Sequence, residues 1–156
     1  MIAKGVTVAG ATTLVYIRPS TIASMRILRC WVSQNGTTTS EQEGVALYFQ
    51  PKATGTLTGA TPFQHGGISD AASSIVSGTS GAAGTAGINA SAEGTGTITY
   101  GPSDAFNNLN GWLWVPTPDE AIVIAASSAS GFGLMLTASP TSKTLWNAGV
   151  TWAEIG

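Results

Sequence analysis

The chain has 156 residues, only 9% of them charged, and a formal net charge of −2. Nucleic-acid binding needs a cationic stripe that displaces phosphate counterions. The six lysines and arginines here are scattered, so we expect no nucleic-acid partner. The single cysteine excludes an intramolecular disulfide, but a chain of this length can bury a core without one. We therefore expect a single domain over residues 1–156.

Short strands separated by turn residues dominate the predicted elements, and helical periodicity is almost absent. Residues 1–12 are expected to form an N-terminal arm or an edge strand. Strands are predicted, in chain order, over Gly5–Ala9, Thr13–Ile17, Met25–Ser33, Val45–Gln50, Thr95–Tyr100, Gly111–Val115, Ala121–Ala126, Phe132–Thr137 and Val150–Ile155. Ser69–Ser77 is the one helical candidate, with Gly78 ending it. Many strands without intervening helices predict an all-β antiparallel sandwich or barrel.

Several predicted strands are apolar at successive positions: VALYF at 45–49, WLWV at 112–115, AIVIAA at 121–126 and LML at 134–136. A strand with one face in water should alternate apolar and polar residues, so both faces of these strands need burial. We expect the second face to meet another copy of the chain or a larger surface. Roofing of central strands by the chain's own loops is the alternative.

Residues Ala121–Ser142 carry no charge over 22 positions, which approaches the composition of a membrane-spanning helix. The centre of this stretch is SSASGFG, however, and its Ser and Gly residues favour a β-hairpin and no membrane partner. Elsewhere, Cys30 alternates with Leu28 and Val32 in a predicted strand. That alternation predicts a buried thiol rather than a reactive one.

No catalytic or metal centre is predicted. His65 is the only histidine, and together with one cysteine it cannot supply the three or four ligands of a standard zinc site. Two acidic pairs, Glu41 with Glu43 and Asp119 with Glu120, fall in predicted loops. Carboxylates there are ordinarily solvated rather than tuned as general acid and base. We expect no enzyme activity, no cofactor and no bound metal.

Two tryptophans form the sharpest candidate site. Trp112 and Trp114 are two residues apart on one predicted strand, so their rings project from the same face. Sugar-stacking platforms of carbohydrate-binding modules use paired rings in this way, but the neighbouring Leu113 and Val115 offer none of the polar donors that usually flank them. We favour burial of both rings in a core or in a seam between subunits, and a sugar platform is the alternative.

Four glycines, Gly78, Gly81, Gly84 and Gly87, fall at intervals of three in GTSGAAGTAGINASAEGTGT. A collagen helix needs many more triplets and abundant proline, so we predict one long loop, rich in Gly, Ala, Ser and Thr, over Gly78–Thr97. Its small residues suit close packing along a neighbouring subunit, and a solvated loop is the alternative. The candidate residues of an assembly interface or core are Trp112, Trp114, Gly81, Gly84, Gly87 and Ile88.

The last third of the chain resembles the closing strands of β-sandwich proteins from the virions of tailed bacteriophages, of the capsid decoration or cement type. The likeness lies in the order of parts: an aromatic strand (GWLWV), a Pro-rich acidic turn (PTPDE), an apolar strand (AIVIAA), a GFGLML strand and a final VTWAEIG strand. The TLVYIRP and RILRCWVSQ segments are similar to the opening strands of such chains.

This resemblance implies a jelly-roll-like sandwich that forms a homotrimer. It also implies binding to the major capsid protein on the outside of a virion, where such proteins strengthen the shell against internal DNA pressure. No functional residue is carried over individually, because the likeness contains no site motif. A phage receptor-binding or carbohydrate-binding module of the same fold is the alternative function.

Overall fold

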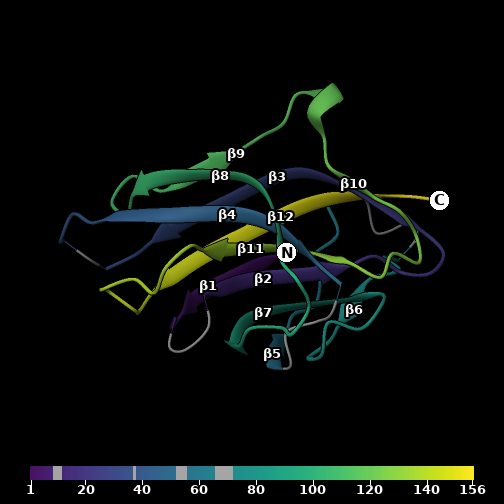
Figure 1. The fold of residues 1–156 in the computed structure, drawn as a ribbon, viewed down its shortest axis with the longest axis horizontal. Coiled ribbons are helices and arrows are strands. Elements are labelled where there is room, and N and C mark those ends of the chain that lie inside the picture. Colours follow the sequence, from purple (N-terminus) through teal and green to yellow (C-terminus); the bar gives the residue numbers. More distant parts are fainter. Residues whose placement is uncertain (9–11, 37, 52–55, 66–71) are drawn as a thin grey trace.

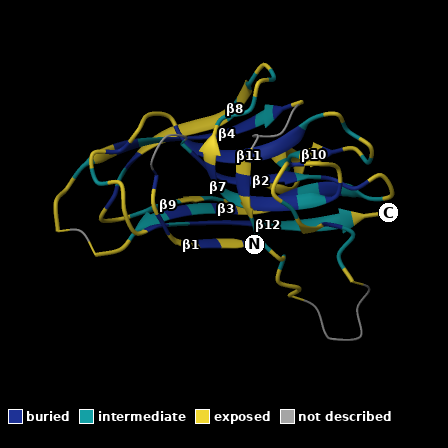
Figure 2. Ribbon diagram, turned by 90° about the horizontal axis from the view of Figure 1, so that it is seen from below, coloured by how far each residue is buried: buried dark blue, intermediate teal, exposed yellow. Residues whose placement is uncertain are grey.

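The computed structural model describes residues 1–8, 12–36, 38–51, 56–65 and 72–156, and Figure 2 shows their strands stacked in two layers. Sheet A contains β1 (Ile2–Val6), β3 (Ser24–Gln34), β9 (Trp112–Trp114), β10 (Val123–Ile124) and β12 (Trp146–Ile155). Sheet B contains β2 (Thr13–Arg18), β4 (Gln42–Gln50), β5 (Thr56–Gly59), β6 (Val76–Ser77), β7 (Thr85–Ala92), β8 (Thr99–Asn107) and β11 (Gly131–Leu136). One 3₁₀ turn, η1 (Pro118–Glu120), connects β9 to β10.

The strands pair in a nested order. Strand β1 pairs with β12, β2 with β11, β3 with both β9 and β10, and β4 with β8, so the chain is matched from its ends inward. One long antiparallel ribbon folded across two sheets gives this order, which is the jelly-roll topology. The pairs β3–β12 and β4–β11 then join successive turns of the ribbon (Figure 1). The prediction of an all-β, jelly-roll-like antiparallel sandwich is confirmed.

An insertion between β4 and β8 enlarges sheet B. Its strands β5, β6 and β7 lie beyond β2, so the sheet runs in the order β5-β7-β2-β11-β4-β8 with β6 also paired to β7. The short β6–β7 ladder is parallel, and the other ladders of the described residues are antiparallel. Sheet B is thereby wider than sheet A.

Inward-facing side chains of both sheets form the main core. Its largest member is Trp146 on β12, which has no exposed surface. The indole Nε1 donates a hydrogen bond to the Ser142 carbonyl at 2.8 Å, and the ring meets Phe106 edge-on with centroids 6.3 Å apart. A tryptophan fills a core without cost only when its N–H finds a partner, and this one does.

Strand β3 contributes to the core with a break in its alternation. Ile27 and Cys30 are both buried, while Leu28 between them is exposed, because the β3–β12 register shifts between Thr151 and Trp152. Such a bulge sets two residues of one strand against one of the other and resets which side chains face inward. The buried thiol of Cys30 is confirmed, although Leu28 does not share its face.

Sheet B has a second, smaller core on its outer face. Tyr16 and Tyr48 point away from the main core and are still fully buried, because Leu57, Ala90 and Ile98 cover them. The covering residues belong to β5, β7 and the segment that leads into β8. For VALYF and LML the second apolar face is therefore roofed by the chain itself, as in the alternative prediction.

Glu93 fastens this roof to sheet B. Its Oε1 accepts hydrogen bonds from the backbone N–H groups of Thr12 and Thr13 at 2.6 and 2.9 Å, and its Oε2 accepts one from the Thr13 hydroxyl at 2.6 Å. The same hydroxyl lies 2.8 Å from the phenol oxygen of Tyr48. A carboxylate that accepts several N–H and O–H bonds is held in one position, so the segment after β7 stays over the two tyrosines.

Two predicted segments in the middle of the chain need correction. Within Gly78–Thr97, residues Thr85–Ala92 form β7, because this stretch pairs with β2 on one side and β5 on the other. The helix predicted over Ser69–Ser77 is also not observed in its described part, since Val76–Ser77 forms β6. Residues 69–71 lie outside the described residues.

The uncharged stretch Ala121–Ser142 does not form the predicted β-hairpin. Strand β10 pairs with β3 in sheet A, and β11 pairs with β2 and β4 in sheet B, so the chain crosses between the layers after Ile124. The stretch is apolar because both of its strands contribute side chains to the main core. In the described part of the chain, no helix has the length and apolar character needed to cross a membrane.

Candidate assembly surface

The outer face of sheet A carries a row of apolar side chains. The strand registers align Ile2 of β1 with Gly149 of β12, Gly149 with Trp31 of β3, and Trp31 with Leu113 of β9. Ile2 is 60% exposed and Leu113 is 62% exposed, with the half-buried Trp31 between them. Side chains that are directly opposite on neighbouring strands contact one another, so the four positions form one continuous strip.

Gly149 explains how Trp31 is held in this row. A Cβ atom added to Gly149 would overlap Nε1 and Cε2 of the Trp31 indole, so the ring lies directly over the glycine. The missing side chain makes room for the indole to lie flat across β12. The tryptophan therefore has one face against the sheet and the other toward solvent.

Two further exposed valines lie next to the strip. Val115 comes directly after β9 and is 60% exposed, and Val123 of β10 is 58% exposed opposite Arg26 of β3. We call Ile2, Trp31, Leu113, Val115 and Val123 the sheet A patch. Several exposed apolar side chains on one sheet are typical of a surface that meets another macromolecule.

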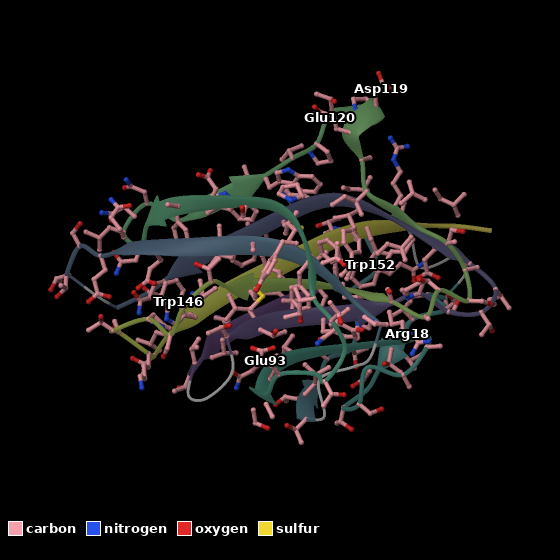
Figure 3. All side chains as sticks on the ribbon, viewed as in Figure 1. Arg18, Glu93, Asp119, Glu120, Trp146 and Trp152 are labelled. Carbon is pink, nitrogen blue, oxygen red and sulfur yellow. The ribbon has the colours of Figure 1, made fainter. Side chains whose placement is uncertain are left out.

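Cations lie on β1 and β3 of sheet A, and two carboxylates lie on the turn at one edge of the sheet. Lys4 on β1 and Arg29 on β3 are exposed, and no carboxylate of the described residues pairs with either. Arg26 donates through Nη2 to the Pro118 carbonyl at 3.0 Å. Asp119 and Glu120 lie at the opposite edge of sheet A, at the tip of the projecting η1 turn (Figure 3).

The predicted tryptophans lie behind this surface rather than on it. Trp112 and Trp114 pair with Val32 and Cys30, share their inward face and pack against the main core while remaining partly exposed at the sheet edge. Their rings project from one face, as predicted, but that face is the interior. Leu113, between the two tryptophans, is the outward residue of this strand.

The predicted glycines serve the chain's own packing. Gly81, Gly84 and Gly87 are all buried, and Gly81 and Gly84 have positive φ angles of 58° and 71° in the turn before β7. A Cβ at Gly87 would come within 2.7 Å of the Gly78 carbonyl oxygen and of Leu57 Cβ. Gly87 and Ile88 belong to β7 of sheet B, on the opposite layer from the sheet A patch, and Ile88 packs against the main core.

A groove of about 630 Å³ opens beside the middle of β3 and the C-terminal end of β12. Phe63, which is 73% exposed, and Trp152 line it with Arg29, and His65 packs edge-on against Phe63 with centroids 5.4 Å apart. His65 itself is exposed. A groove of this size, with aromatic walls and a few polar groups, can accept a small ligand.

Glu154 at the groove is already fully engaged by the chain. It accepts hydrogen bonds from the Ser73 hydroxyl, from the backbone N–H of Ser74 at 2.8 Å and from the Ser74 hydroxyl. Burial opposes ionisation of this carboxyl, but the hydrogen bonds from Ser73, Ser74 and Trp152 outweigh it and lower the pKa. Glu154 therefore anchors the segment before β6 to the end of β12.

The other candidate reactive groups are a buried thiol and one pair of carboxyl groups. Burial raises the pKa of the Cys30 thiol, which removes thiolate character at neutral pH. Among the described residues, no three His, Cys, Asp or Glu side chains lie close enough to hold a metal ion. Glu41 and Glu43 do meet: Glu43 is buried at the start of β4, and its side chain hydrogen-bonds to that of Glu41.

The carboxyl pair predicts a pH dependence. Burial raises the pKa of Glu43, and the charge and hydrogen bond of Glu41 raise it further. The folded state then binds more protons than the unfolded state, so the stability that Glu43 contributes is present below its ordinary pKa and is lost as pH rises through the raised one. We expect Glu43→Gln to gain stability relative to wild type as pH increases from 4 to 7, measured by urea unfolding.

The exposed Gln42→Ala variant, which changes no titratable group, is the control for this measurement. Its stability difference from wild type should not change over the same pH interval. If the stability difference between Glu43→Gln and wild type also stayed constant from pH 4 to 7, a raised pKa at Glu43 would be contradicted.

No family model, curated protein or solved structure matches the chain.

Proposed function

We propose that the protein is a non-enzymatic virion structural protein, which binds the outside of a tailed-bacteriophage capsid as a decoration protein and acts as a homotrimer. The sheet A patch is the observation that carries this proposal. Sheet B covers its second apolar face with its own chain, whereas sheet A leaves Ile2, Leu113, Val115 and Val123 open. An uncovered apolar sheet face favours a protein whose role is assembly with other proteins.

Stabilisation of a shell would come from many modest contacts. A homotrimer presents three copies of each contact, so binding of one copy raises the effective concentration of the others at the shell. Low charge suits this role, since long-range repulsion between neighbouring copies is small. The major capsid protein is the proposed partner.

Co-sedimentation with emptied capsid shells of tailed phages tests the proposal. We expect saturable binding at a fixed ratio to the shell subunits, and we expect decorated shells to rupture at a higher temperature than bare ones. Leu113→Asp should weaken binding, because a carboxylate would be placed in the sheet A patch. Absence of binding to every shell, together with saturable glycan binding, would overturn the proposal.

The groove supports a second candidate function, a carbohydrate-binding or receptor-binding module. Aromatic rings stack on sugar faces, and the platform in this case would be the exposed Phe63 and the partly buried Trp152 with Arg29, which line the groove. Titration with oligosaccharides, followed by tryptophan fluorescence, distinguishes the two functions. A saturable signal that Phe63→Ala abolishes would favour the module.

A further inference from the structure

We propose that the acidic η1 turn of one copy docks on the basic, apolar half of sheet A of a second copy. This contact rests on the self-association in the proposed function and supplies its surfaces. The two surfaces are different parts of one chain, so the contact is head to tail. Head-to-tail contacts form a ring when their rotation closes, and three copies would give the proposed trimer.

The acceptor surface is the half of sheet A toward β1. Ile2 and Trp31 form its apolar floor, and Lys4 and Arg29 are its cations. Two exposed cations thus make this half of the face positive, without a carboxylate paired to Lys4 or Arg29 among the described residues.

The inserting surface is the turn from Val115 to Glu120. Pro116 and Pro118 restrict its backbone, the Glu120 N–H donates to the Thr117 carbonyl at 3.1 Å, and the Thr117 hydroxyl donates to Glu120 Oε2 at 2.9 Å. Arg26 holds the Pro118 carbonyl from β3. A preorganised turn loses little conformational entropy when it binds, which favours its use as a contact.

Lys4 and the acidic turn can meet only between copies. Lys4 lies on β1 and the η1 turn leads into β10, which are opposite edges of sheet A in the order β1-β12-β3-β10. Three strand spacings separate these edges, about 14 Å at the usual interstrand distance. Asp119 and Glu120 project away from their own sheet (Figure 3), so a second copy is the partner that brings them to Lys4.

The apolar parts match as well. Val115 and the exposed Pro118 of the turn would cover Ile2 and the solvent-facing side of Trp31 in the second copy. Burial of the indole face supplies affinity, while the Lys4 and Arg29 contacts select the acidic turn over neutral loops.

Charge reversal tests the contact by sedimentation velocity of the purified protein. Lys4→Glu with Arg29→Glu, and separately Asp119→Lys with Glu120→Lys, should each raise the dissociation constant of the oligomer about tenfold or more. All four substitutions in one chain should restore it to within about threefold of wild type, since every contact again joins opposite charges. Restoration is a result that general destabilisation cannot produce.

Lys143→Glu and Asp104→Lys are matched controls on exposed residues away from both surfaces, and they should leave the oligomer intact. Near-ultraviolet circular dichroism establishes that each variant is folded. A wild-type chain that is monomeric at all concentrations, or a fourfold variant as weak as its parents, would overturn the inference. If the charge pattern governs self-association but no shell is bound, the proposed function fails and this contact stands.

Discussion

Replacing Trp146 by alanine is expected to lower the free energy of unfolding by about 3–5 kcal/mol, which is the range for deleting a large aromatic side chain from a core. The ring is fully buried, and its loss would leave a cavity against Phe106 and remove one of the two side-chain hydrogen bonds to the Ser142 carbonyl, which would keep the one from Gln34. Urea unfolding at pH 7, followed by circular dichroism, measures the change.

Two variants make this measurement specific to the core. Trp146→Phe keeps most of the apolar volume but cannot donate to Ser142, so its loss should be clearly smaller than that of the alanine variant. Leu113→Ala removes an exposed side chain, and its monomer stability should change by less than about 0.5 kcal/mol. Equal losses at Trp146 and Leu113 would contradict the assignment of inner and outer faces on sheet A.

Strand existence could be predicted well where apolar and β-branched residues cluster. The predicted segments Thr13–Ile17, Met25–Ser33 and Phe132–Thr137 match β2, β3 and β11 to within a residue or two at each end. These strands lie inside their sheets, where the interior itself demands apolar side chains. Composition and fold agree there, so local patterns are sufficient.

Edge and inserted strands could not be predicted from composition. Strand β8 reads TYGPSDAFN, whose Gly, Pro, Ser and Asp are typical of a loop, and only its pairing with β4 makes it a strand. Proline and charge are tolerated at this sheet edge and discourage further pairing there. Strand β7 could not be predicted either, because its small residues have little strand preference and form a strand only through pairing with β2 and β5.

The local sequence also could not predict which side chains of WLWV point inward. Both faces of this strand are apolar, so the sequence predicts burial of each without saying which is inside. The register with β3 decides it by placing Trp112 and Trp114 beside Val32 and Cys30, and a shift of one residue would reverse the faces. Trp112 and Trp114 therefore take the core position that was one of their two predicted roles, and Leu113 between them faces outward.

The spacing of the two glycines in GFGLML reflects their contacts in the fold. Gly131 and Gly133 are two apart on β11, so they share a face, and each would place an added Cβ inside a tyrosine ring, Tyr16 for Gly131 and Tyr48 for Gly133. Gly149 and Trp31 repeat the arrangement on sheet A. In these three cases, a strand carries a glycine where the aromatic ring of a residue on the neighbouring strand lies across it.

Gly133→Ala is expected to cost about 1–3 kcal/mol of unfolding free energy, the usual range for overpacking a core. The added methyl group would overlap Cε1 and Cζ of Tyr48, whose ring is fully buried and whose hydroxyl is tied to Thr13. The ring cannot move outward without lifting the segment that Glu93 fastens to β2. Urea unfolding of the purified variant gives the loss directly.

The matched control is Gly101→Ala on edge strand β8, where the nearest atom to an added Cβ is the Leu47 carbonyl oxygen at 3.4 Å. Since alanine restricts the unfolded chain, this control should be neutral or slightly stabilising, by up to about 1 kcal/mol. In a Tyr48→Leu background the Gly133→Ala loss should shrink, because the overlapping ring is gone. A loss of the same size with and without the ring would show that the cost arises in the backbone of β11 and not in the roof over sheet B.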